Sequence, residues 1–365
     1  MRGEVTMEFV YKFPVVRGVQ AKREYYIAMV PLKMISRLFP IDEEYVLPEF
    51  RAQRKLNEAR VPVISKYILD NRENYVFSAL AASIDGRFTY KPNIENPDTG
   101  VLEVSMEARF LINDGQHRKA AILDAIKEDE SLGDETISIV LFEDKGLARS
   151  QQIFTDLNKN AVKTSNSIAE LYDSRDSLAV ITRNVINSNE FLNAYTDKEK
   201  DILGKFSSNL FTLNTFYTAN KYIFATSNIR NQEKAEAFLL RYWNAVVENM
   251  TQWNELQAKE ISKVDLRENY IATQGIVVQA LGRIGRYFYE NPDANIEKIL
   301  IGLKKMNWKR NAKQWKLRAI RENGRVITNK HAATLIANTI KETVGIPLTD
   351  DEISAEEKFK KTVIK

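Results

Sequence analysis

The chain has 365 residues, enough for two domains of ordinary size. Hydrophobic residues make up 44% and charged residues 28%, which suits a globular protein and argues against disorder. Cysteine is absent, so disulfides, thiolate metal sites and a cysteine nucleophile are excluded. The two histidines, His117 and His331, have no zinc-like spacing, and we expect no structural metal.

Targeting segments are not visible in the sequence. Residues 1–11 lack an apolar core of signal-peptide length. No stretch approaches the roughly 18 apolar residues that a membrane helix needs. We therefore expect a cytoplasmic protein that does not contact a membrane.

The first 165 residues alternate between strand-like and helix-like segments, which predicts an α+β domain over residues 1–165. A helical region is expected at 51–71, where Pro62 must start or break a helix. Apolar runs bounded by turn signals indicate strands. These runs lie at 25–30, 75–84, 101–104, 108–113 and 137–142.

Residues 166–365 predict a mainly helical domain, because strand signals are sparse there. Apolar residues recur at helical spacing in 238–253, more loosely in 275–289, and again around Leu335 and Ile336. Three pairs have the spacing of a helix capping box. They are Ser167 with Glu170, Thr196 with Glu199, and Thr349 with Glu352.

The most informative segment runs from Arg109 to Leu123. Phe110 to Ile112 is strand-like, Asp114-Gly115 is a turn signal, and an apolar helix face follows. Gln116, His117 and Arg118 are therefore predicted at a helix N-terminus directly after a strand.

This arrangement predicts a phosphate site. The free backbone N–H groups and the dipole of a helix N-terminus attract anions, and Gly115 allows close approach. Arg118 could make forked contacts to phosphate, His117 could act as an acid or base, and Asp114 could hold Mg²⁺. We therefore name Asp114, His117 and Arg118 as candidate catalytic residues. The alternative is that Asp-Gly is an ordinary turn and that His117 and Arg118 are structural.

Positive charge is concentrated near the C-terminus. Residues 303–330 contain ten Lys or Arg and one acid, a local net of +9, so the rest of the chain carries −5 of the total of +4. Such a segment predicts salt-dependent binding to a polyanion. The candidate DNA contacts are Lys304, Lys305, Lys309, Arg310, Lys313, Lys316, Arg318, Arg321 and Arg325.

Two tryptophans, Trp308 and Trp315, interleave with these charges. They could stack on bases, but indoles seven residues apart more often pack one helical face into a core. The alternative for the charges is a solvated helix. No helix-turn-helix is evident, so base-specific readout is not predicted.

Residues 114–118 spell Asp-Gly-Gln-His-Arg, the motif that names the DGQHR family, and the chain resembles its DndB members of DNA phosphorothioation systems. The resemblance extends over nearly the whole chain. It includes 52–54 with Arg60, Ile64 and 67–68; the strand-like 75–80; 154–160 with Lys163 and Ser165; and 308–310 with 324–325.

The resemblance implies a ParB/sulfiredoxin-like core, in which a strand, turn and helix ending in Arg bind nucleotide phosphates. Gly115, Gln116, His117 and Arg118 then become the expected phosphate group, with Gln53, Arg54 and Asn158 as secondary candidates. Asn158, Asn160 and Lys163 could touch a nucleotide or DNA phosphate, and the alternative is that they are ordinary loop and capping residues. Sulfiredoxin chemistry is excluded because that branch uses a cysteine.

Three functions stay open. The first is a DNA-binding transcriptional regulator of the modification genes that responds to a nucleotide. The second is an NTPase that uses ATP or another nucleotide with Mg²⁺, coupled to DNA binding or nicking in phage defence. The third is a scaffold for modification or restriction subunits. Expected partners are double-stranded DNA, other phosphorothioation proteins and a second copy of the chain.

Overall fold

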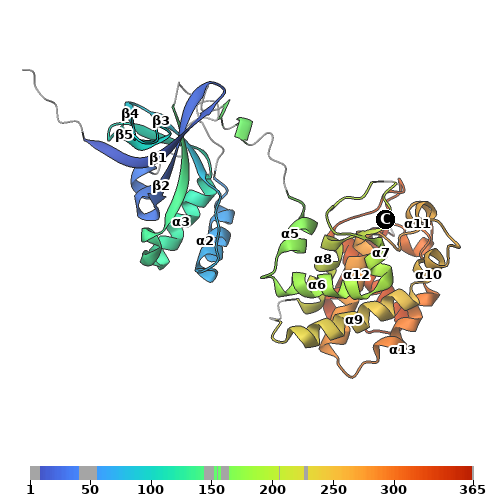
Figure 1. Ribbon diagram of the computed structural model, residues 1–365. Helices are drawn as coiled ribbons and strands as arrows, with labels where there is room; N and C mark the ends of the chain where they lie inside the picture. Colours follow the sequence, from blue (N-terminus) through green and yellow to red (C-terminus); the bar gives the residue numbers. More distant parts are fainter. Residues whose placement is uncertain are drawn as a thin grey trace, which may run out of the picture. The chain divides into compact units, whose positions relative to one another are not determined.

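The computed structural model describes residues 9–40, 56–143, 152–153, 155–157, 164–204, 206–225 and 229–363. The chain divides into two compact units, residues 1–162 and 163–365 (Figure 1). The sequence-based boundary after residue 165 lies three residues beyond this division. The first unit contains a mixed sheet with helices and the second is mainly helical, so the predicted α+β fold class is confirmed.

A seven-stranded sheet forms the first unit, in the order β4-β5-β1-β2-β7-β3-β6. All neighbouring strands are antiparallel except β3 and β7, which are parallel. The strands are β1 (Val10–Gln20), β2 (Arg23–Pro31), β3 (Leu80–Asp85), β4 (Phe88–Pro92), β5 (Thr99–Ser105), β6 (Arg109–Asp114) and β7 (Thr136–Glu143).

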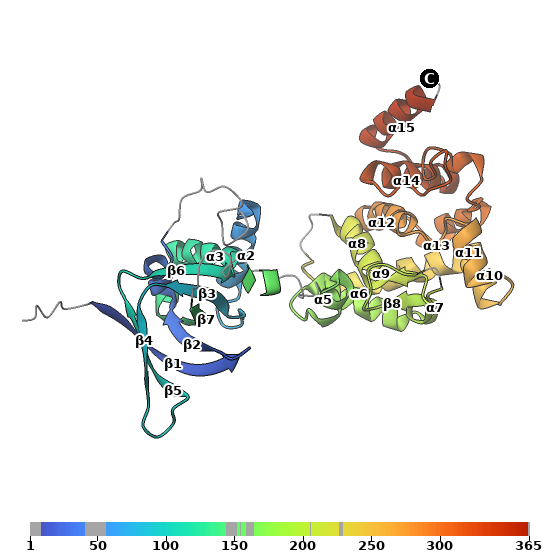
Figure 2. The same cartoon turned by 90° about the horizontal axis from the view of Figure 1, so that it is seen from above.

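Helices α2 (Val61–Asp70) and α3 (Gln116–Glu128) pack against each other and against the sheet (Figure 2). Ile68 of α2 and Ile122 of α3 share a buried cluster with Ile84 of β3. This cluster is the core of the first unit. The short helices of the first unit are η1 (Leu32–Met34), α1 (Ile35–Leu38), η3 (Glu58–Arg60) and η4 (Glu130–Asp134).

Alternating apolar residues explain the strands that the sequence predicted correctly. In β7, Ile137, Ile139 and Leu141 are buried and the residues between them are more exposed, the period of two that a strand requires. The strands predicted at 25–30, 101–104, 108–113 and 137–142 are confirmed. Most of their predicted ends lie within about one residue of the observed ends. The prediction at 75–84 was wrong in its first half, because β3 begins only at Leu80.

Strand β1 and strand β4 were not predicted. β1 contains Pro14, which argues against an internal strand because proline donates no backbone hydrogen bond. In the structure, β1 pairs with β5 over Val10–Val16 and with β2 over Val15–Gln20. Pro14 therefore lies where β1 pairs with one neighbour only, and the missing N–H leaves no gap in the β1–β2 pairing.

The second unit is built from eleven helices within the part of the chain that the structure describes. A two-stranded parallel ladder joins β8 (Thr196–Asp197) to β9 (Phe211–Thr212). The helices are α5 (Asn166–Tyr172), α6 (Ser177–Ser188), α7 (Glu190–Tyr195), α8 (Leu213–Phe224), α9 (Gln232–Asn249), α10 (Thr251–Gln257), α11 (Lys263–Asn269), α12 (Gly275–Glu290), α13 (Ile296–Leu300), α14 (Lys330–Val344) and α15 (Asp350–Val363), with the short η5 (Ile301–Lys305) and η6 (Lys313–Trp315).

Helix α12 lies at the centre of this unit and packs on α8 and α14. Gly282 permits the close contact with α8, since a Cβ there would lie 2.4 Å from the carbonyl oxygen of Ala219. Trp243 is fully buried, and its indole N–H donates to Asn220 Oδ1 at 2.8 Å. The core thus combines close helix packing with satisfied polar groups. No helix in the described parts of the chain is both long and apolar enough to cross a bilayer.

Of the three predicted capping boxes, one is confirmed. The Thr349 amide donates to Glu352 Oε2 at 2.9 Å, and the Glu352 amide contacts Thr349 Oγ1 at 3.4 Å. The prediction at Ser167 was wrong, because Ser165 caps α5 by accepting from the Ile168 amide. The prediction at Thr196 was also wrong, since Thr196 lies in β8 and the next described helix, α8, begins only at Leu213.

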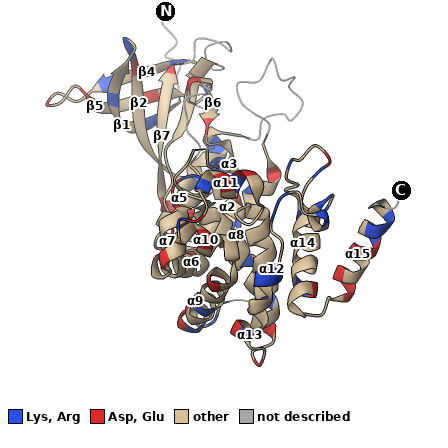
Figure 3. Cartoon of the chain, turned by 90° about the vertical axis from the view of Figure 1, so that its right-hand side faces the viewer, with Lys and Arg blue, Asp and Glu red and all other residues tan. Residues whose placement is uncertain are grey.

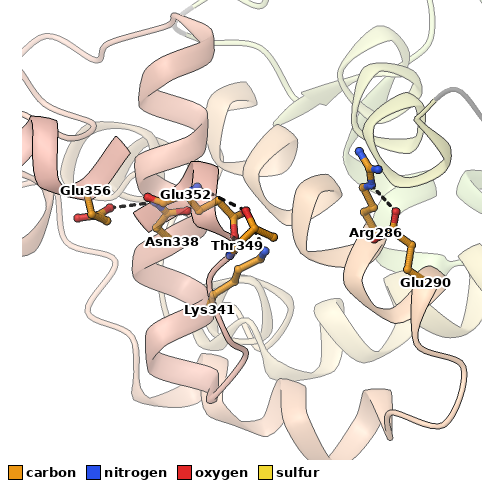
Figure 4. Close-up of polar contacts among 7 residues, drawn as sticks. All are labelled: Arg286, Glu290, Asn338, Lys341, Thr349, Glu352 and Glu356. Atoms are coloured by element: carbon orange, nitrogen blue, oxygen red, sulfur yellow. Dashed lines mark hydrogen bonds and ion pairs between the residues drawn. The ribbon is translucent and has the colours of Figure 1, made fainter. Parts of the chain in front are cut away.

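Helix α15 is held on α14 mainly by charged side chains (Figure 4). Lys341 of α14 donates to both carboxylate oxygens of Glu352, at 2.7 and 2.8 Å. Arg318 makes a bidentate pair with Glu356 at 2.5 and 2.6 Å, and Asn338 adds a bond at 3.1 Å. Burial opposes ionisation of Glu356, but the bonds from Arg318 and Asn338 outweigh it and hold the pKa of this carboxyl below its usual value.

We expect Glu356→Ala to destabilise the protein by about 3 kcal/mol, because it leaves the Arg318 cation partly buried without its carboxylate. The control is Glu290→Ala, which removes the exposed pair of Arg286 and Glu290 in Figure 4 and should cost less than about 0.5 kcal/mol. Urea unfolding measures both. Equal effects of the two substitutions would contradict this assignment.

Glu170 of α5 is a half-buried carboxyl close to two other acids. Burial, followed by repulsion from Asp201 and Asp176, raises the pKa of Glu170 to about 8, and Lys221 opposes the rise. Asp201 accepts from the Asn166 and Ser167 amides at 2.8 and 2.9 Å. The folded chain therefore favours a protonated Glu170 next to two acids that make defined hydrogen bonds.

This carboxyl predicts a pH effect on stability. Between the unfolded pKa and about 8, the folded state holds one proton more than the unfolded state, so stability falls as pH rises through this range. Glu170→Gln stays neutral and should raise the thermal midpoint at about pH 9, with the difference vanishing near pH 4. A difference that does not change with pH would refute the coupling.

Candidate functional site

The Asp114–Arg118 segment forms the predicted strand, turn and helix. β6 ends at Asp114, Gly115 is the N-cap, and α3 begins at Gln116. Gly115 has φ +100°, a left-handed conformation that favours glycine. A Cβ on this residue would lie 2.4 Å from Leu80 Cδ2 of β3. The turn therefore requires glycine for both its backbone conformation and its packing.

The Arg118 side chain is held within the first unit by hydrogen bonds and an ion pair. Its Nη1 donates to the carbonyl oxygens of Ser78 and Ala79, each at 2.7 Å, and its Nη2 pairs with Asp114 Oδ2 at 2.5 Å. The side chain is only 18% exposed. These contacts join the start of α3 to the segment that enters β3, which is the structural role considered as the alternative for this arginine.

His117 also makes an internal contact. Its Nε2 accepts a hydrogen bond from the Asn57 amide at 2.9 Å, so that nitrogen carries no proton in this arrangement. Asp114 is engaged by Arg118, and no group of three or more metal-ligating side chains occurs among the described residues. The three candidate catalytic residues are thus brought together, but their side chains bond to the protein itself.

The phosphate site predicted at this turn stays a prediction. Among the described residues, no side chain forms a hydrogen bond that caps the N-terminus of α3. A free helix N-terminus attracts negative charge through its amides and dipole. Gln116 lies half-buried in the first turn. The secondary candidates Gln53, Arg54 and Asn158, together with Asn160 and Lys163, lie outside the described residues.

Residues 303–330 form an irregular loop after α13, not the solvated helix considered as an alternative. Only η5 and η6 interrupt it, and Lys316–Ile320 and Ile320–Val326 bridges shape its turns. Trp308 and Trp315 are buried and stack with ring centroids 5.5 Å apart at 15°. Base stacking by these tryptophans is therefore not supported, because both rings belong to the core of the second unit.

Most cations of this loop are exposed, and Figure 3 shows them on the segment that precedes α14. Within the described residues, none of these exposed side chains forms an ion pair. They are Lys304, Lys305, Lys309, Lys313, Lys316, Arg321 and Arg325.

Two of the predicted DNA contacts have internal partners. Arg318 is paired with Glu356 and lies over the Phe359 ring at 4.4 Å, with only 14% of its side chain exposed. Arg310 donates to the carbonyl oxygens of Arg267 at 2.9 Å and Gly324 at 3.5 Å. We therefore leave Arg318 out of the candidate DNA surface, because its charge is already compensated.

The loop and α11 line an open hollow of about 710 Å³. The α11 side contributes Asp265, Glu268, Asn269 and Tyr270. Burial, with the nearby Asp265 and Glu255, raises the pKa of Tyr270. The loop contributes all of the remaining lining, which is Lys309, Arg310, Asn311, Ala312, Lys313, Lys316, Ile320, Arg321, Glu322 and Gly324.

The α11 wall was not predicted from the sequence. Its residues follow an ordinary helical pattern about 40 positions before the loop, and no spacing connects the two segments. In the structure the Arg310 amide donates to Asn269 O at 2.8 Å and the Ile271 amide to Trp308 O at 2.9 Å. These long-range contacts, together with the bond from Arg310 Nη2 to the Arg267 carbonyl oxygen, bring the α11 residues to the basic loop.

The fold and these features define a two-unit α+β protein whose second unit has a basic loop beside a polar hollow. The chain belongs to the DndB family, described as DNA-sulfur modification-associated, whose model matches residues 13–347. The match covers most of both units, confirms the resemblance seen in the sequence, and connects the chain to DNA phosphorothioation. No curated protein and no solved structure matches the chain, so the ParB/sulfiredoxin-like core stays a prediction.

We expect Gly115→Ala to destabilise the first unit by about 2 kcal/mol, because alanine is strained at positive φ and meets Leu80. Amide hydrogen exchange in α3 should speed up accordingly. Gly204→Ala is the control, since a Cβ at Gly204 would have no heavy atom within 4 Å. Unchanged exchange in α3 of the Gly115 variant would show that the turn tolerates a side chain.

Proposed function

We propose that this chain is a DNA-binding regulator of the DNA phosphorothioation genes. The observation that carries the proposal is the set of exposed, unpaired cations on the 303–330 loop. The stacked Trp308 and Trp315 anchor this loop in the core, so its charges are held on a defined surface. Double-stranded DNA is the expected partner, because a polyanion that binds such a surface releases its condensed counterions.

Contacts to the DNA backbone are the expected mode of binding. Lysines act as point charges and dominate this surface, and they fit phosphate oxygens without reading bases. The tryptophans are unavailable for stacking because they are buried. Specific recognition of an operator must therefore use contacts other than these indoles, such as sequence-dependent DNA shape.

The test is a DNA-binding titration at several salt concentrations, with and without ATP or CTP. We expect Lys309→Gln combined with Lys313→Gln to reduce the slope of log affinity against log salt by about 1.8, since each lost phosphate contact removes about 0.9. Both lysines are exposed and unpaired among the described residues.

The matched control for this titration is Lys234→Gln combined with Lys298→Gln, two exposed lysines on other helices of the second unit. It removes the same charge and should leave the slope within about 0.3 of the unmodified value. Equal reductions in both variants would mean that net charge, and not this loop, governs binding. No change in either would remove the loop from the DNA surface.

A second candidate function, an NTPase at the Asp114–Arg118 turn, has one observation in its favour: Gly115 leaves the N-terminus of α3 without a side-chain cap. ATP or another nucleotide with Mg²⁺ would be the cofactor. Its test is phosphate release by the purified protein. Loss of release in Arg118→Ala, with α3 still protected from hydrogen exchange, would favour it, and unchanged release would remove Arg118 from the chemistry.

A further inference from the structure

We propose that the hollow between α11 and the basic loop binds one nucleotide unit, a phosphate together with its sugar and base. The hollow measures about 710 Å³, within the range of roughly 300–1,000 Å³ common for small-molecule sites. This proposal adds a ligand site to the proposed DNA-binding function. It rests on that function only if the bound nucleotide belongs to a DNA strand.

The loop wall supplies an uncompensated positive charge. Arg310 reaches two carbonyl oxygens, which are neutral acceptors and leave its charge unbalanced. Its Nε is buried and has no hydrogen-bond partner among the residues that the structure describes. Lys309 and Lys316 also line the hollow, and neither forms an ion pair within the described residues. An anionic group is the ligand that these side chains fit best.

The α11 wall carries different chemistry. Asp265 and Asn269 bond to each other at 2.6 Å and offer further donor and acceptor positions, and Tyr270 adds an aromatic ring. Carboxylates and amides of this kind recognise the edges of bases and sugar hydroxyls. The lining as a whole carries five cations and three anions, and the anions are Asp265, Glu268 and Glu322. This balance suits one phosphate joined to a neutral polar group better than a chain of phosphates.

The two walls are fixed relative to each other. Tyr270 and Lys309 form an antiparallel bridge, and the Arg310 amide donates to Asn269 O at 2.8 Å. Trp308, directly before Lys309, is fully buried. The hollow is therefore preformed, and a ligand needs to order few side chains when it binds.

The test uses the full chain and titration calorimetry with the four deoxynucleoside monophosphates, with the nucleosides and inorganic phosphate as comparisons. At least one monophosphate should bind about tenfold more tightly than its nucleoside and than phosphate alone. Asn311→Trp fills the hollow from an exposed position and keeps every cation, so it should weaken this binding about tenfold or more. Arg310→Lys keeps the positive charge but removes the forked N–H donors of the guanidinium, and it should weaken monophosphate binding to a similar extent.

A second arm distinguishes a free nucleotide from one in a DNA strand. A duplex with one unpaired nucleotide should bind more tightly than a fully paired duplex if the strand is the source, and Asn311→Trp should abolish that difference. If only free monophosphates are bound, the two duplexes bind alike. The proposal is overturned if Asn311→Trp and Arg310→Lys, both folded by circular dichroism, change neither monophosphate binding nor the preference for the unpaired nucleotide.

Failure of the broader DNA-binding function gives a different result. Asn311→Trp should leave the salt slope for the fully paired duplex unchanged, because the exposed lysines remain. A chain that binds monophosphates in the hollow but shows no salt-dependent duplex binding would disprove DNA binding by the loop and support the hollow. The opposite result is salt-dependent duplex binding in a chain whose monophosphate binding and preference for the unpaired nucleotide do not change when Asn311→Trp fills the hollow. That result would support DNA binding by the loop and disprove the nucleotide site.

Discussion

The stacked pair of Trp308 and Trp315 is the contact on which the candidate DNA surface depends. A loop with a local net charge of +9 cannot hold itself together, since like charges repel and a chain without regular structure loses much entropy on ordering. Burial of two indoles gives the loop a large apolar contact with the core. The rings turn inward, and the lysines between and around them remain in solvent.

Arginines join separate segments in both units in the same way. Arg310 and Arg318 bind carbonyl and carboxylate oxygens inside the second unit, while the lysines beside them stay free. In the first unit, Arg118 binds Asp114 and two carbonyl oxygens around the glycine turn. A planar guanidinium has five donors and can join several segments at once, whereas a lysine offers a flexible point charge. Arg118, Arg310 and Arg318 therefore join segments of the fold, whereas Arg321, Arg325 and the exposed lysines of the loop make no ion pair among the described residues.

Sequence patterns predicted the fold well where one local signal dominated. The alternation in β7, the strand and glycine turn before α3, and the capping box at Thr349 are all short-range patterns. The β1–β2 hairpin was missed because Ala21 and Lys22 occupy its turn with positive φ, where Asn-Gly would have been the recognisable pair. The hollow was missed because its α11 wall meets the loop only through long-range contacts, and the inward packing of Arg118 and Arg318 depends on partners far away in the chain.

The pair of Arg318 and Glu356 has a consequence for how the C-terminal helix and the basic loop interact. Arg318 belongs to the loop and Glu356 lies on α15, so a carboxylate of the last helix compensates one of the loop's cations. The pair connects two segments of the second unit that are 38 residues apart in the chain. Loss of the Glu356 carboxylate would release α15 from this contact and, at the same time, add one uncompensated cation to the loop, so the C-terminal helix helps to set the net positive charge that the loop presents.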